Sequence, residues 1–217
     1  RANANPAREL KQLLDDRDLL GKRIGVEYDT QGLTALNGRR VDDALSTFAT
    51  LEDASTLVPQ LRSIKSPAEI DYAKKAAALA DDALDAAIPL VRAGTDESSI
   101  LAAMQGAIFE GGGDYAGNEF IIGSGEDALL CRYKSGRRKL EKNDQLTLEW
   151  AGAYRRYHAA MMRTVLTGKP SGRHVELYEA AKSALLACEA AMKPGNTFGD
   201  VFDAHAKAMA DADLTRH

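Results

Sequence analysis

The chain has 217 residues, of which 45% are hydrophobic and 28% are charged, a composition typical of a globular protein with a substantial core. Its formal net charge of −4 disfavours nucleic acid and anionic membranes as partners, and neither a bilayer-spanning apolar run nor a signal peptide is expected. The two cysteines, Cys131 and Cys188, have neither zinc-site nor disulfide-framework spacing, which predicts reduced thiols and a cytoplasmic protein.

The first 65 residues are expected to form the end of an N-terminal α/β domain. Leucines at helical spacing between residues 10 and 20 predict a helix that Gly21 ends. Alternating apolar residues over 23–28 predict a short strand, and a second helical pattern covers 33–45. Residues 55–61 predict a short helix or turn. A complete α/β domain contains more strands, so the chain is expected to be truncated at its N-terminus.

Two helices are predicted next, at the start of a domain spanning residues 66–217. Ser66 and Glu69 form a capping-box pattern, with Pro67 at the first helical position of an alanine-rich helix that reaches about residue 93. Pro89 is expected to kink its last turn. Thr95 is predicted to cap the second helix, which ends before three consecutive glycines.

After these glycines the period of the apolar residues changes from helical to two. Strands are predicted at 120–123, 129–133, 145–150 and 157–166. The connections are of hairpin length, with one turn at 152–153, so an antiparallel sheet is expected. Two further helices are predicted at 175–192 and 198–212. The order of elements predicts an α+β domain with helices on one face of its sheet.

Glu149 is the first candidate functional residue, because it is a carboxylate within an apolar strand. Such a group is costly to bury unless it is paired or functional. Alternation places Thr147, Glu149 and Ala151 on one face of the strand, however, so plain solvent exposure is an alternative that the pattern also allows.

His158 and Arg163 are the next candidates, because they lie in a strand otherwise made of alanines and methionines. Small side chains leave room for a ligand. Alternation places Arg163 on the face opposite to His158 unless a bulge intervenes. Residues 137–139 are basic and are expected to form a solvated loop. No histidine has a spacing to carboxylates that predicts a metal site, so neither metal nor other cofactor is expected.

Three segments of the chain resemble the pita-bread hydrolases, a family that includes methionine and Xaa-Pro aminopeptidases, creatinases and ectoine hydrolases. They cover residues 61–84, 120–170 and 190–209, and the strongest local match is Arg163-Thr164 followed by Gly168-Lys169-Pro170. The resemblance implies a partial pita-bread fold in which the chain contains the first half of the catalytic domain. It also implies a homodimer, since members of the family are often dimers.

Departures from the family pattern point to one subfamily. The metallopeptidases have an Asp at the position of Glu149 and a second, metal-bridging Asp at the position of Ala160. They also have a His at the position of Arg132, which creatinases retain although they have lost the metal. The segments CRYKSGRR, LTLEWAG and YRRYHAAMMRT together most resemble ectoine hydrolases, which open a cyclic amidine ring without a metal.

This resemblance implies a metal-independent hydrolase that converts ectoine or 5-hydroxyectoine into an N-acetyl-diaminobutyrate. Glu149 is expected to pair with the amidinium and to act as nucleophile or general base, and His158 to transfer a proton. Substrate-binding roles are expected for Arg132, which would hold the carboxylate, and for Tyr133, Trp150 and Arg163. Two alternatives remain open: a dinuclear-metal peptidase or lyase of the same fold, and a non-catalytic pita-bread domain that binds a protein partner.

Overall fold

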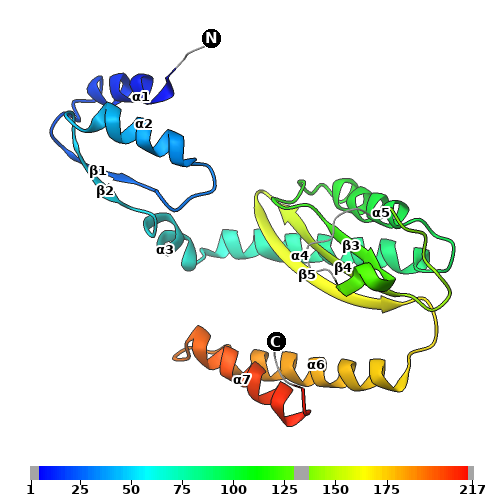
Figure 1. Cartoon of the computed structure of the whole chain (residues 1–217). Coiled ribbons are helices and arrows are strands. Elements are labelled where there is room, and N and C mark those ends of the chain that lie inside the picture. The colour runs from blue at the N-terminus through cyan, green and yellow to red at the C-terminus, as the bar shows by residue number, and fades with distance from the viewer. Residues whose placement is uncertain (1–4, 130–136, 215–217) are drawn as a thin grey trace. The chain divides into compact units, whose positions relative to one another are not determined.

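The computed structural model describes residues 5–129 and 137–214 (Figure 1). The chain divides into two compact units, Arg1–Ile70 and Asp71–His217, so the division lies slightly after the predicted boundary at residue 65. Each unit is described by itself. Within the described residues, no helix is long and apolar enough to cross a membrane.

The first unit combines helices with a small parallel sheet. Its elements are α1 (Pro6–Asp15), β1 (Arg23–Val26), α2 (Ala35–Leu45), β2 (Thr50–Asp53) and α3 (Leu57–Ser63). Strands β1 and β2 pair in parallel, with Arg23 opposite Thr50. The sequence did not predict β2, because its side chains are mostly exposed and show no apolar alternation. A bidentate ion pair between Arg23 and Glu52 links the two strands.

Two helices come next in the chain, and the sequence predicted their ends in part. The capping box of α4 (Pro67–Ala87) is confirmed, because Ser66 N donates to Glu69 Oε2 at 2.7 Å and Glu69 N donates to Ser66 Oγ at 3.4 Å. The α-helix ends at Ala87, and Pro89 lies in the following 3-10 turn, Ile88–Leu90, rather than in a kinked last turn. Helix α5 (Glu97–Glu110) is capped by Asp96 and not by Thr95, because Asp96 Oδ1 accepts from Ser98 N at 2.9 Å.

The sheet of this unit is antiparallel, as predicted. Strands β3 (Ile121–Ser124), β4 (Gln145–Tyr154) and β5 (Tyr157–Leu166) lie in the order β3-β4-β5. The strand expected over 129–133 is wrong at its start, because Leu129 ends the 3-10 helix Gly125–Leu129, and the rest of that range lies outside the described residues.

The turn expected at 152–153 is also wrong. Strand β4 continues to Tyr154, and the turn is made by Arg155 and Arg156, with φ of 51° and 70°. Positive φ at both central residues matches the twist of the flanking strands in a two-residue hairpin. These two non-glycine residues gave no turn signal in the sequence.

One face of the sheet packs on α4 and α5 to form the core (Figure 1). Trp150 is 3% exposed, and its Nε1 donates to Ala80 O in α4 at 3.0 Å. Next to it, α4 lies so close to β4 that a Cβ at Gly152 would be 2.6 Å from Ala80 N and closer still to Ala76 O. Gly152 therefore interrupts no strand; it is required by the close approach of the helix backbone.

Helices α6 (Gly172–Ala191) and α7 (Phe198–Asp211) pack against each other around Ala180 and Ala184. His174 completes a capping box at the start of α6. Ser171 N donates to His174 Nδ1 at 3.1 Å, and His174 N donates to Ser171 Oγ at 3.2 Å.

Gly152→Ala tests the contact between α4 and β4. The added methyl group meets helix backbone that cannot move away alone, so the variant should lose about 1–3 kcal/mol of unfolding free energy. Denaturant unfolding measures the difference. Gly106→Ala is the control, because Gly106 lies within α5 and a Cβ there meets nothing within 4 Å, so the free energy should stay equal or rise. Equal stabilities of wild type and Gly152→Ala would contradict the packing.

Candidate active site

Strand β4 has two faces, and they divide the sheet into a core side and an open side. Leu146, Leu148 and Trp150 are buried against the helices, whereas the residues between them are half-buried. Register then assigns the members of the open side, which we call the Glu149 face: Ile121, Gly123, Thr147, Glu149, Ala151, Ala153, His158, Ala160, Met162 and Thr164.

Glu149 lies in the middle of this face, on the central strand of the described sheet. Ile121 is its partner on β3 and Met162 its partner on β5. Ile121 is 2% exposed and Met162 50% exposed, so the carboxylate stands between a buried and an open apolar neighbour. Among residues 5–129 and 137–214, no side chain forms an ion pair or hydrogen bond with it. A half-buried carboxylate in this state is suited to bind a cation.

Position 160, where the resemblance gives the metallopeptidases a second Asp, is an alanine in this chain. Ala160 pairs directly with Ala151, one step along the sheet from the Glu149–Met162 pair. In the part of the chain that the structure describes, no group of three or more His, Cys, Asp or Glu residues could hold a metal ion. A centre of two metal ions needs bridging carboxylates. The side chains of the Glu149 face therefore do not fit such a centre.

Two of the expected substrate-binding residues lie on the other side of the sheet. Trp150 is part of the core and its indole N–H is already bound by Ala80 O. Arg163 pairs with Leu148, and no bulge in β5 returns it to the Glu149 face; its Nη1 donates to Met162 O at 2.8 Å. The structure therefore does not place either side chain on the Glu149 face, because alternation along a regular strand separates neighbours. Arg132 and Tyr133 lie outside the described residues.

His158 does lie on the Glu149 face, but away from the carboxylate. It pairs with Ala153, four residues from Glu149 along β4, which is roughly 13 Å at the usual rise of a strand. Both ring nitrogens contact backbone: Nε2 accepts from Gly117 N at 2.9 Å, and Nδ1 lies 3.0 Å from Arg156 O. The structure therefore does not bring His158 and Glu149 together as a proton-transfer pair.

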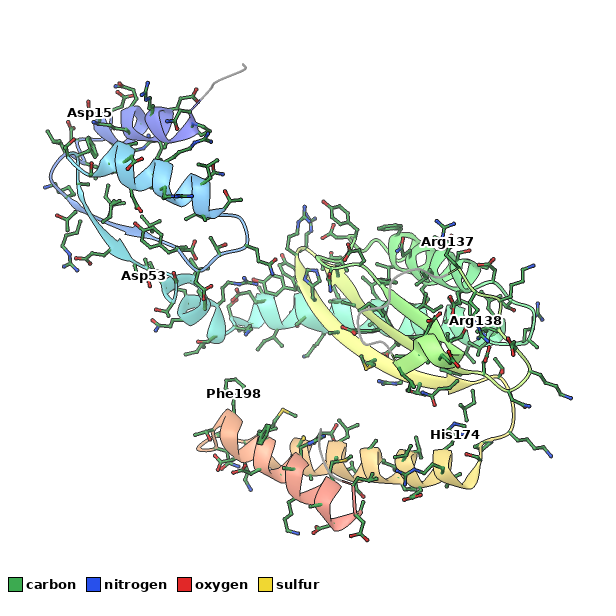
Figure 2. All side chains as sticks on the ribbon, in the orientation of Figure 1. Asp15, Asp53, Arg137, Arg138, His174 and Phe198 are labelled. Carbon is green, nitrogen blue, oxygen red and sulfur yellow. The ribbon has the colours of Figure 1, made fainter. Side chains whose placement is uncertain are left out.

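Arg138 is a residue whose role the sequence did not reveal. Its side chain is labelled in Figure 2. The guanidinium, expected to be solvated, donates to Ser124 Oγ, Asp144 Oδ2 and Glu141 Oε1. Its backbone exchanges two hydrogen bonds with buried Glu97. The bond to Asp144 raises the pKa of Arg138, so its charge is permanent. This network holds residues 137–144, which precede β4, against the end of β3.

Arg138→Ala should therefore destabilise the fold. It leaves the buried Asp144 carboxylate without its cation, and loss of charge-assisted hydrogen bonds costs about 1.5–3 kcal/mol. Thermal or denaturant unfolding measures the change. Arg137→Ala is the matched control, since Arg137 is its exposed neighbour and should change stability by less than about 0.5 kcal/mol. Similar losses in both variants would contradict the special role of Arg138.

Comparison with known proteins supplies a family. The model of metallopeptidase family M24 matches residues 71–217. The chain is 29% identical over 206 residues to the ectoine hydrolase of Halomonas elongata, covering 91% of this chain and 51% of that protein. It is 25% identical over 189 residues to the Xaa-Pro dipeptidase of Pyrococcus furiosus, covering 87% of this chain and 52% of that protein. The chain thus spans about half the length of these relatives.

Solved structures confirm the predicted fold class. The prolidase from Pyrococcus furiosus superposes with a TM-score of 0.81 at 22% identity, over 94% of this chain and 58% of that chain. A Xaa-Pro dipeptidase from Bacillus anthracis superposes with a TM-score of 0.82 at 24% identity, over 96% of this chain and 57% of that chain. The chain has a partial pita-bread fold of the α+β class, as the sequence predicted.

Proposed function

The chain belongs to metallopeptidase family M24 and is a hydrolase of that family, and from this premise we propose that it opens the cyclic amidine ring of ectoine or 5-hydroxyectoine without a metal ion. The observation that carries the proposal is the Ala151–Ala160 pair beside Glu149, where two-metal relatives would need a second carboxylate. The similarity to an ectoine hydrolase supports the same substrate. Further parts of the proposal are a cytoplasmic homodimer and no nucleic-acid or membrane partner.

Ectoine carries an amidinium cation and a carboxylate, and Glu149 is the proposed partner of the cation. Its carboxylate is half-buried and has no side-chain partner in the described segments, so an amidinium would replace water there. Pairing is stronger where water is partly excluded. Arg132 is the proposed partner of the substrate carboxylate, in a bidentate contact.

The same carboxylate would carry the chemistry. Acting as general base, Glu149 takes a proton from water as the oxygen bonds to the amidine carbon, and the ring C–N bond then breaks with a proton passing to the leaving nitrogen. Acting as nucleophile, Glu149 bonds to that carbon itself, and the ring C–N bond breaks with a proton passing to the leaving nitrogen. Water then hydrolyses the bond between the Glu149 oxygen and this carbon, which restores the free carboxylate. Both routes end in an N-acetyl-diaminobutyrate.

The apolar neighbours of Glu149 fit the hydrocarbon part of such a substrate. Ile121 and Met162 flank the carboxylate, and Ala151 and Ala160 continue the surface as a floor of methyl groups. A site with one charged group among small apolar side chains suits a compact ring with a methyl substituent.

A metal-dependent Xaa-Pro peptidase is the second candidate function. The similarity to Xaa-Pro dipeptidases in sequence and fold favours it, at identities close to that of the ectoine hydrolase. Ala160 counts against it, because a methyl group cannot ligate metal.

Metal dependence separates the two candidates. Full-length protein treated with a strong chelator should retain its rate of ectoine hydrolysis within about twofold, since no step depends on a metal ion. Product formation is followed by chromatography, together with elemental analysis of the sample. Manganese, cobalt or zinc at one equivalent or more, lost together with activity and restored with it, would establish the peptidase-like alternative.

Glu149→Gln should abolish turnover and leave the fold intact. The amide keeps the size of the side chain but can neither balance the amidinium nor act as base or effective nucleophile. Glu149→Asp withdraws the oxygens by about 1 Å, which should cost about 10²-fold in kcat if attack is covalent. Steady-state kinetics and circular dichroism measure both effects.

The control is Glu110→Gln, which removes an exposed carboxylate at the end of α5 and should retain full activity. Mass spectrometry of protein quenched during turnover distinguishes the two routes through an adduct on the peptide that contains Glu149. A fully active Glu149→Gln variant would remove Glu149 from the mechanism.

A further inference from the structure

The segment between α5 and β3, residues 114–120, crosses the end of the Glu149 face. Asp114 N donates to Ala153 O at 2.8 Å, and Arg156 N donates to Asp114 Oδ2 at 3.2 Å, so the segment is bound at the hairpin turn. Its middle is held by the 2.9 Å bond from Gly117 N to His158 Nε2. Ala153 on this face is fully buried, as expected where the segment passes over it.

The segment leads directly into the candidate site. Ile121, the residue after it, pairs with Glu149. On the helix side, the segment and residues Gln105, Ile108 and Phe109 of α5 line a pocket of about 350 Å³ that is open to solvent. Residues 117–119 are exposed, so the hydrogen bonds to the hairpin become correspondingly important for the position of the segment.

His158 can form its bond to Gly117 in one protonation state only. Arg156 O is solely an acceptor, so Nδ1 carries the proton of the neutral ring and Nε2 is the acceptor that Gly117 N–H requires. A protonated ring carries a proton on Nε2 as well, so two N–H groups would face each other and the hydrogen bond to Gly117 could not form. The neighbouring ionisable side chains are Asp114, Tyr115 and Glu119 on the segment and Arg155, Arg156 and Tyr157 at the hairpin, and Tyr115 stacks under the Arg156 guanidinium at 5.4 Å.

We propose that His158 is a positioning residue whose neutral imidazole holds residues 114–120 as the end wall of the substrate site on the Glu149 face. Residues 114–120 bound the site at the hairpin end of β4, beyond the apolar surface of Ala151 and Ala160. The site therefore accepts a compact ring and excludes a ligand that extends along β4. This inference rests on the proposed function and adds a determinant of its specificity. It also gives the imidazole a role that does not require contact with Glu149.

Two substitutions separate the two bonds of the imidazole in the full-length protein. In His158→Gln, the side-chain oxygen replaces Nε2 as acceptor for Gly117 N–H. In His158→Asn, the shorter amide retains a donor for Arg156 O but does not reach Gly117. Hydrogen exchange of the Gly117 amide should be about tenfold faster in His158→Asn and near the wild-type rate in His158→Gln, since one hydrogen bond is lost only in the former.

The pH dependence of that amide gives a second readout, which mere misfolding would not produce. A protonated imidazole has no lone pair to accept from Gly117 N–H, so protection of Gly117 in the wild type should be lower at acid than at neutral pH. In His158→Gln, protection should be independent of pH over the same range. Unchanged protection of Gly117 in His158→Asn would overturn the proposal.

Kinetics with ectoine tests the wall itself. His158→Asn should raise KM about tenfold with kcat within about twofold, and His158→Gln should restore KM. A loss of kcat in both variants with unchanged KM would overturn the positioning role and make His158 a proton-transfer group. If wild-type protein does not turn over ectoine, the proposed function fails, while exchange at Gly117 still decides whether His158 holds the segment.

Discussion

The close approach of α4 to β4 is the constraint on which the site depends. Gly152 lies against the backbone of Ala76 and Ala80. Trp150, two residues before Gly152 in β4, donates its indole N–H to Ala80 O. Together they fix both the distance of the helix and the register of the strand. A shift of one residue would exchange the two faces of β4 and move Glu149 into the core. The position of the carboxylate is therefore determined by contacts on the side of the sheet that it does not face.

The two ends of β4 are fixed by different means. At its start, Arg138 joins Asp144 to Ser124 and so connects β4 with the end of β3. At its far end, the tight hairpin and the bond between His158 and Gly117 bind the segment before β3. Glu149 lies between these anchored ends, so its strand has little freedom to shift. A residue that must meet a substrate in one geometry benefits from such rigid support.

What the sequence predicted depended on local rules. The bounds of β5, the capping box at Ser66 and the alternation around Glu149 follow from spacings of two to four residues, and the structure confirms them. The sequence did not predict that Trp150 lies in the core, because an apolar side chain beside a candidate carboxylate is equally suited to a pocket or a core. Arg138 depends on partners 6 and 14 residues away in the chain and His158 on one 41 residues away, and no helix or strand periodicity encodes such contacts.

The balance of charge on the Glu149 face connects the fold to the proposed chemistry. A pair of divalent metal ions requires several carboxylates to offset its charge, and the described part of this face presents one, beside threonine hydroxyls, alanine methyl groups and a methionine. The single negative charge of Glu149 would balance the single positive charge of an amidinium. In the proposed function, an alanine at position 160 has a positive role, since a methyl group there would not repel the carboxylate of ectoine and would leave space for the ring. The alanine that disfavours a two-metal centre is thus compatible with the compact organic cation that we propose as the ligand of this face.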